Sequence, residues 1–258
     1  MSNPWADTPL SLISETGLES RPDIPPDHAA AQFAQRMACL HNTIFRSFNA
    51  CYNQCLNVKK GTKDASDLLV YNQVLCEGIE HHHHVEEEYM FPGLEKLSGI
   101  EGLMDKNIQQ HRDFEAGLKK LREYAFNTDA SAYDGEKLKT ILDILGPVLE
   151  KHLHAEISTL LDLSKYDSEK LFEVWELVAK KAEAGTDKFR YGVMMLACTD
   201  NTFLVDGKNV RYPPFPAFVP YLTKWVFQWS YSGAWRFAPC DLFGNPKPLA
   251  FLNPTLEG

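Results

Sequence analysis

Apolar side chains recur at steps of three and four residues along four long stretches of the sequence, a period typical of helices with one buried face. In the first stretch the repeated positions are Phe33, Met37, Leu40, Ile44, Phe48, Tyr52 and Cys55. Asp27 stands directly before this stretch and carries a side chain that is common at N-caps. We therefore expect a first helix from about residue 28 to residue 57.

The next three stretches have the same period. The second runs to Phe91-Pro92, where the proline is expected to kink or stop the helix. The third follows Gly99, and the fourth follows the loop at 127–131. Their repeated positions are Leu68, Leu75, Ile79, His82 and Glu86, then Leu103, Ile108, His111, Phe114, Leu118 and Leu121, then Leu142, Leu145, Leu149, His152, Glu156 and Leu160. Four long helices with short connections predict an all-α fold, an up-down-up-down four-helix bundle at residues 28–163.

The two ends of the chain differ from this periodic body. Residues 1–27 contain five prolines, which predicts an extended N-terminal arm. The cap signal Asp167-Ser168 predicts a fifth helix at about 168–184. Residues 185–258 are rich in proline and aromatic residues, so we expect residues 164–258 to form an irregular, partly helical cap packed on the bundle.

Composition excludes several classes of function. The net charge is −9 and no block of five Lys or Arg residues occurs, which argues against nucleic-acid and membrane partners. No signal peptide or membrane-spanning apolar run is recognisable, so we expect a cytoplasmic protein. The six cysteines form no Cys-x-x-Cys pair and are expected to be reduced and mostly buried.

All nine histidines precede residue 155, so any shared role belongs to the bundle. His82 and Glu86, like His152 and Glu156, lie one helical turn apart within an apolar stripe. A buried, unpaired glutamate costs several kcal/mol, so a compensating cation is expected. Imidazole and carboxylate ligands suit iron or manganese.

Other histidines and acids are less informative. His41 or His111, taken singly, fits a hydrogen-bonded core residue better than a ligand, but histidines recur on all four helices. In the run from His81 to His84 only one or two side chains can face the core. Glu87 and Glu88 are expected at the surface.

The segments that carry these residues resemble hemerythrin and the related hemerythrin HHE cation-binding domains, in an extended form with the aromatic, proline-rich C-terminal region. They are His41-Asn-Thr-Ile, His82-His-His-Val-Glu86-Glu-Glu-Tyr-Met-Phe-Pro92, His111-Arg-Asp-Phe and His152-Leu-His-Ala-Glu156. Ferritin-like di-iron proteins are the neighbouring alternative, but they use Glu-x-x-His. Only Glu80 and His83 fit that spacing, and this pair has no counterpart on the fourth helix.

The resemblance implies two non-haem iron ions (Fe2+/Fe3+), which an oxo or hydroxo group would bridge. The ligands it implies are His41, His82, Glu86, His111, His152 and Glu156, with Glu86 and Glu156 as bridging carboxylates. Where hemerythrin has another histidine one turn before the one that matches His111, this chain has Asn107. Four replacements stay open, namely water, Glu115, His83 and His154.

Three hypotheses for the function follow. The first is a di-iron oxidase or oxygenase that binds dioxygen and oxidises a small organic substrate, with the C-terminal cap enclosing the pocket. The second is a non-catalytic oxygen or iron binder for storage, sensing or detoxification. The third is an interaction scaffold whose metal is structural. The sequence does not identify the substrate.

Overall fold

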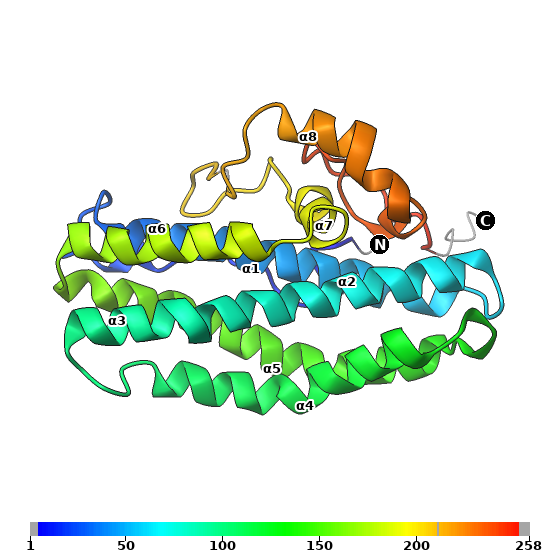
Figure 1. Cartoon of the computed structure of the whole chain (residues 1–258), viewed down its shortest axis with the longest axis horizontal. Coiled ribbons are helices and arrows are strands. Elements are labelled where there is room, and N and C mark those ends of the chain that lie inside the picture. Colours follow the sequence, from blue (N-terminus) through cyan, green and yellow to red (C-terminus); the bar gives the residue numbers. More distant parts are fainter. Residues whose placement is uncertain (1–4, 211, 253–258) are drawn as a thin grey trace.

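In the computed structural model, which describes residues 5–210 and 212–252, helices form the body of the protein and no β-strand occurs within the described ranges. The four long helices are α1 (Ala29–Gln54), α2 (Lys63–Val85), α4 (Asp105–Asn127) and α5 (Gly135–Leu161). They lie side by side along the long axis of the molecule (Figure 1). Helix α1 contacts α2 and α5, and α4 contacts the same two helices. The predicted all-α four-helix bundle is therefore confirmed.

Side chains at the helix starts satisfy the free N–H groups. The Nδ1 atom of His28 accepts from Ala30 N at 3.1 Å, while Ala29 N donates to Ser168 Oγ. The N-cap of α1 is thus His28, one residue beyond the predicted Asp27. Asp167 caps α6 (Ser168–Gly185), which agrees with the predicted fifth helix.

The second helix does not stop at Pro92. Helix α2 continues through a π-helical turn (Glu86–Met90) into α3 (Phe91–Ser98). Phe91 N donates to Glu86 O in this wider turn, and Pro92 stands in the first turn of α3, where no N–H is required. The wider turn, which begins at Glu86, thus lets the chain pass the proline without ending the helix.

The described part of the C-terminal region lies over the side of the bundle formed by α1 and α2 (Figure 1), and α6 also contacts α3. It contains α6, α7 (Tyr191–Cys198), α8 (Val219–Leu222), a π-helical turn (Thr223–Phe227) and two 3-10 helices (Gln228–Tyr231 and Ala234–Phe237). Its aromatic residues divide into two groups. Trp235 and Phe237 join the core, whereas Trp225 and Trp229 are 70% and 62% exposed.

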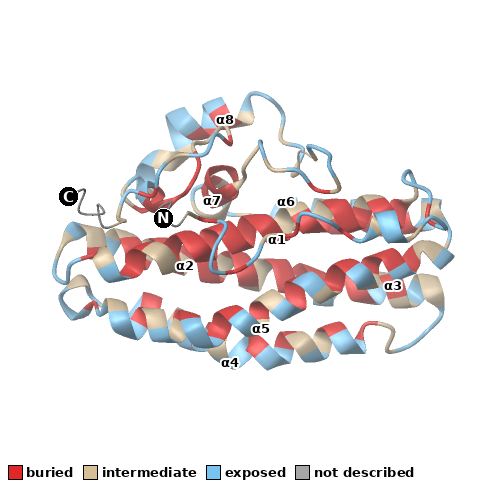
Figure 2. Cartoon of the chain, turned by 180° about the vertical axis from the view of Figure 1, so that it is seen from behind, coloured by how far each residue is buried: buried red, intermediate tan, exposed pale blue. Residues whose placement is uncertain are grey.

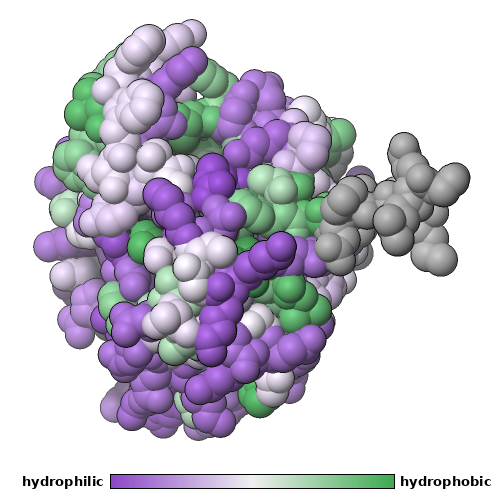
Figure 3. Space-filling view, turned by 90° about the vertical axis from the view of Figure 1, so that its right-hand side faces the viewer, coloured by the Kyte–Doolittle hydropathy of each residue, from purple (hydrophilic) through white to green (hydrophobic). Residues whose placement is uncertain are grey.

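Burial follows the predicted stripes. The inward faces of the bundle helices are buried (Figure 2). Seen from the end, hydrophilic residues predominate in the lower part of the surface, and hydrophobic patches are more frequent in the upper part (Figure 3). None of the helices in the described residues combines the length and hydropathy that a membrane crossing requires. All six cysteines are free thiols, and five of them are buried.

Candidate metal centre

Seven histidine and glutamate side chains meet inside the bundle. They are His41 from α1, His82 and His83 from α2, Glu86 from the start of the π-helical turn, His111 from α4, and His152 and Glu156 from α5. All seven are at least nine-tenths buried. The six residues expected from the sequence are therefore brought together, and His83 joins them.

These side chains form two groups of four that share one carboxylate. The first group is His41, His82, Glu86 and Glu156, and the second is His83, Glu86, His111 and His152. Within each group, one potential ligand atom per residue lies within 4.8 Å of the others. Glu86 faces both groups, since its Oε1 is 3.0 Å from His82 Nε2 and its Oε2 is 3.5 Å from His111 Nε2. Glu156 belongs to the first group only.

Three of the imidazole rings are oriented through Nδ1. His41 Nδ1 donates to the carbonyl oxygen of Leu153 at 2.8 Å. His111 Nδ1 lies 2.6 Å from Glu87 Oε1, and His152 Nδ1 lies 3.3 Å from Gln110 Oε1. A carbonyl or carboxylate acceptor places the proton on Nδ1 and leaves the Nε2 lone pair free for a metal ion.

The free nitrogens point at one another. His111 Nε2 and His152 Nε2 are 3.1 Å apart, and so are the Nε2 atoms of His41 and His82. Because His111 and His152 both donate through Nδ1, two lone pairs face each other when both rings are neutral. A cation between these nitrogens removes that repulsion.

Several buried polar atoms at the centre also lack hydrogen-bond partners. Within the described residues, these are both carboxylate oxygens of Glu86, both of Glu156 and both ring nitrogens of His83. Leaving a buried carboxylate without a donor is costly, and a metal ion compensates this cost directly. The donor set, its burial and its unsatisfied atoms therefore fit a metal centre.

Burial governs the charge states of these groups. It lowers the pKa of His82 and His83 well below the usual range and lowers that of His152 to about 3. Burial raises the pKa of Glu86, and the nearby Glu156 carboxylate raises it further. For Glu156, burial acts in the same direction, but close contact with His41 and the charges of other histidines outweigh it and lower the pKa to about 2. The lowered pKa values favour the neutral rings of His82, His83 and His152, the form in which an imidazole binds a metal.

Two residues at the centre were not expected from the sequence. Glu87 was expected at the surface, and its side chain is indeed 47% exposed, but it also contacts the His111 ring. Gln110 contacts His152 in the same way. Each is adjacent in the sequence to a potential ligand, Glu86 or His111. This adjacency is the only feature of the sequence that could have indicated their contacts.

The structure distinguishes the three residues among the four replacements considered for the histidine absent at Asn107. Glu115 is exposed. His154 is also exposed, and its Nε2 contacts Ser11 O at 2.9 Å. His83 lies within the second group of four, whereas Asn107 is buried and its side-chain nitrogen has no hydrogen-bond partner in the described part of the chain.

A small cavity lies between α1, α2 and α7, about one turn from His41 and His82. Its volume is about 10 Å³, and Ile44, Ile79, Tyr191 and Met194 are among its lining residues. A larger cavity of about 310 Å³ lies elsewhere, between the N-terminal arm and Asp206 and Lys208. Helix α7 of the C-terminal region therefore closes a space against α1 and α2, but that space is small.

Comparisons with known proteins agree with this geometry. The Hemerythrin HHE cation binding domain family matches residues 35–164. A similar curated protein is the "Dimeric xanthone biosynthesis cluster protein R11" of Cryptosporiopsis sp. (strain 8999). It is 35% identical over 230 residues, which cover 89% of this chain and 86% of that protein. No solved structure gives a significant match.

Proposed function

Because this chain belongs to the hemerythrin HHE cation-binding domain family, we propose that it is a non-haem di-iron protein that binds dioxygen between its helices and oxidises a small organic substrate. The observation that carries the proposal is the pair of four-residue groups that share Glu86. One shared carboxylate between two sets of ligands is the arrangement that holds two cations close together.

The ligand types favour iron. Both groups offer only imidazole and carboxylate atoms, and no cysteine belongs to either. Imidazole and carboxylate ligands suit iron or manganese better than thiolate ligands do. When bound, a ferrous pair supplies the electrons for dioxygen reduction.

The protein's own residues would hold and shelter this centre. Leu153 O, Glu87 and Gln110 orient three of the imidazoles, which fixes the direction of the Nε2 lone pairs. The buried ring of Phe114 lies 4.7 Å from that of His83 and 5.5 Å from that of His152, so it helps to exclude water from the cluster.

The name of the relative supports substrate oxidation. It assigns that protein to a biosynthesis cluster for a dimeric xanthone. A role in biosynthesis favours chemical turnover over the storage of oxygen, and the similarity covers most of both chains.

A different observation favours a second function, the non-catalytic binding of oxygen or iron. The cavity lined by Ile44, Ile79 and Tyr191 has a volume of about 10 Å³. A cavity of that size holds roughly one water-sized molecule. It offers room for a diatomic ligand but not for an organic substrate.

Metal analysis tests the shared part of both functions. Protein purified with and without air should contain close to two irons per chain, with the Mössbauer spectrum of a coupled ferric pair after oxidation. One zinc and no iron per chain would contradict the proposal.

Stopped-flow mixing of the reduced protein with dioxygen then separates the two functions. An oxidase consumes the dioxygen and reaches the ferric state within seconds to minutes, faster when its substrate is present. An oxygen-bound state that persists, and releases dioxygen intact under vacuum, would establish the non-catalytic function instead.

A further inference from the structure

The second group of potential ligands contains a histidine whose role the sequence left open. We infer that His83 binds the second metal ion and supplies the ligand that α4 lacks at Asn107. This inference rests on the proposed two-metal centre. It is supported by the unsatisfied atoms of His83, its position among the other ligands and the register of α2.

The His83 ring is buried but makes no hydrogen bond. It is 7% exposed, and neither ring nitrogen has a partner among the described residues. Histidines that serve only as core residues satisfy their nitrogens, because an unpaired buried polar atom costs about 1–3 kcal/mol. His83 also differs from the neighbouring rings of His41, His111 and His152, each of which has a partner at Nδ1.

The His83 ring lies among the other residues of the second group. Its centroid is 4.4 Å from that of His111 and 5.2 Å from that of His152. The four potential ligand atoms of this group lie within 4.8 Å of one another. Ligand atoms that surround one ion at roughly 2.1 Å are separated by no more than about 4.2 Å. Small ring rotations therefore suffice to bring all four atoms onto one ion.

The register of α2 explains how neighbouring histidines serve different ions. Successive residues of a helix point about 100° apart, so His82 and His83 diverge. Glu86 follows His82 by four residues and His83 by three, and both spacings place it on the same side of the helix as each ring. One turn of α2 thus presents one histidine to each ion and the shared carboxylate to both.

This arrangement gives each ion four residues from the protein. Without His83, the second ion would keep only Glu86, His111 and His152. Glu115 and His154 are exposed and do not belong to either group. The amide of Asn107 is neutral and a poor ligand for iron. His83 is the residue of the second group that restores the number of ligands to that of the first.

The inference predicts a defined change in metal content for His83→Leu, which keeps an apolar side chain of similar size in the core. Iron should fall from about two to about one per chain. The remaining ferric ion should lose its magnetic coupling and give a high-spin electron paramagnetic resonance signal that the coupled pair lacks. His84→Leu is the matched control, because His84 is the next residue but is exposed, and this variant should keep two irons.

A second variant tests whether a histidine on α4 can replace the ligand that His83 supplies from α2. Asn107 precedes His111 by one helical turn, so a histidine there lies on the same face of α4. The double variant His83→Leu/Asn107→His should regain the second iron and the magnetic coupling. A merely structural role for His83 would not predict this rescue.

The outcomes separate this inference from the proposed function. Wild-type protein without a metal pair overturns both. A wild-type protein with two metals and a His83→Leu variant that also keeps two coupled metals overturns the role of His83 alone. Should the variant fail to fold, the crystal structure of the metal-loaded wild type decides. His83 is confirmed if a ring nitrogen lies within about 2.3 Å of the second ion and refuted if it lies beyond 3 Å.

Discussion

At the centre of the bundle, residues that offer no ligand atom decide where the ligand atoms point. Glu87 is the clearest case, because its Oε1 lies 2.6 Å from His111 Nδ1 although half of its side chain is exposed. A carboxylate in this position fixes the tautomer of the ring and raises the electron density at Nε2. Residues of this kind add to metal affinity without contacting the metal.

We therefore predict that Glu87→Ala weakens the binding of the second metal by roughly 10–100-fold, the usual effect of losing such a partner. Competition titration with a chelator of known affinity would measure this. Glu88→Ala is the matched control, since Glu88 is exposed and, within the described residues, makes no hydrogen bond or ion pair with a histidine. Equal losses in both variants would mean that Glu87 acts only through surface charge.

The predictable and unpredictable parts of the site differ in physical origin. His82, Glu86, His152 and Glu156 follow from helical periodicity, because a charged residue inside an apolar stripe is recognisable in the sequence. The contact of Glu87 with His111 depends on how the chain turns after Glu86. Only the folded backbone sets that direction.

Among the elements, the long helix that begins as α2 does not stop where the sequence allowed a stop. The sequence predicted a kink or a stop at Pro92, since a proline in a regular α-helix loses a hydrogen bond and clashes with the preceding turn. The π-helical turn from Glu86 to Met90 instead absorbs one residue and lets α3 follow. Such turns are frequent at functional sites, and this one begins at the carboxylate shared by both ligand groups. Sequence periodicity alone does not reveal it.

The contact between α2 and α7 gives a test at the same scale. Gly78 faces the ring of Tyr191, and a Cβ atom at this position would overlap that ring. Alanine favours a helix over glycine by about 1 kcal/mol, yet the clash should dominate. We predict that Gly78→Ala lowers the free energy of unfolding by roughly 1–3 kcal/mol in urea denaturation.

The double variant serves as the control for this prediction. In a Tyr191→Ala background the obstructing ring is gone, so Gly78→Ala should be neutral or stabilising. A cost that stays the same in both backgrounds would show that α7 does not pack on α2 in solution.

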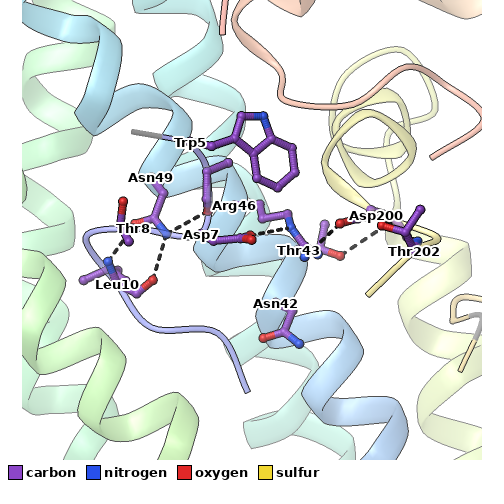
Figure 4. A network of polar contacts seen from close by, with 12 residues as sticks. Trp5, Asp7, Thr8, Leu10, Asn42, Thr43, Arg46, Asn49, Asp200 and Thr202 are labelled. Atoms are coloured by element: carbon purple, nitrogen blue, oxygen red, sulfur yellow. Dashed lines mark hydrogen bonds and ion pairs between the residues drawn. The ribbon is translucent and has the colours of Figure 1, made fainter. Parts of the chain in front are cut away.

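Over the whole molecule, contacts between distant parts of the chain tie both ends to the bundle. The buried Arg46 of α1 lies 3.3 Å from both Asp7 and Asp200 (Figure 4). Its guanidinium also lies over the rings of Trp5 and Phe203. These partners join the N-terminal arm to the segment after α7. The sequence predicted an extended arm and a packed cap but not this contact, because no local pattern links residues so far apart.

The metal centre differs from this contact, because the carboxyl groups of Glu86 and Glu156 lie in the middle of the core without hydrogen-bond partners in the described part of the chain. Glu86 is 1% exposed, and its carboxylate oxygens have no hydrogen-bond donor within the described residues. A metal that binds only the folded protein should stabilise it by about 2.7 kcal/mol at a concentration 100 times its dissociation constant. For a chain of this size, that corresponds to a rise in Tm of roughly 5–10 °C.

The variant Glu86→Leu separates metal stabilisation from ordinary core packing. Replacing an unsatisfied buried charge with an apolar side chain of similar volume is often neutral or stabilising. We predict that the metal-free variant melts at or above the Tm of the metal-free wild type, whereas added iron raises only the Tm of the wild type. Calorimetry of both proteins, with a chelator and with ferrous iron under anaerobic conditions, measures the four values. If Glu86→Leu instead lowers the Tm of the metal-free protein by several degrees, then Glu86 stabilises the fold without metal, and its burial is no argument for a cation.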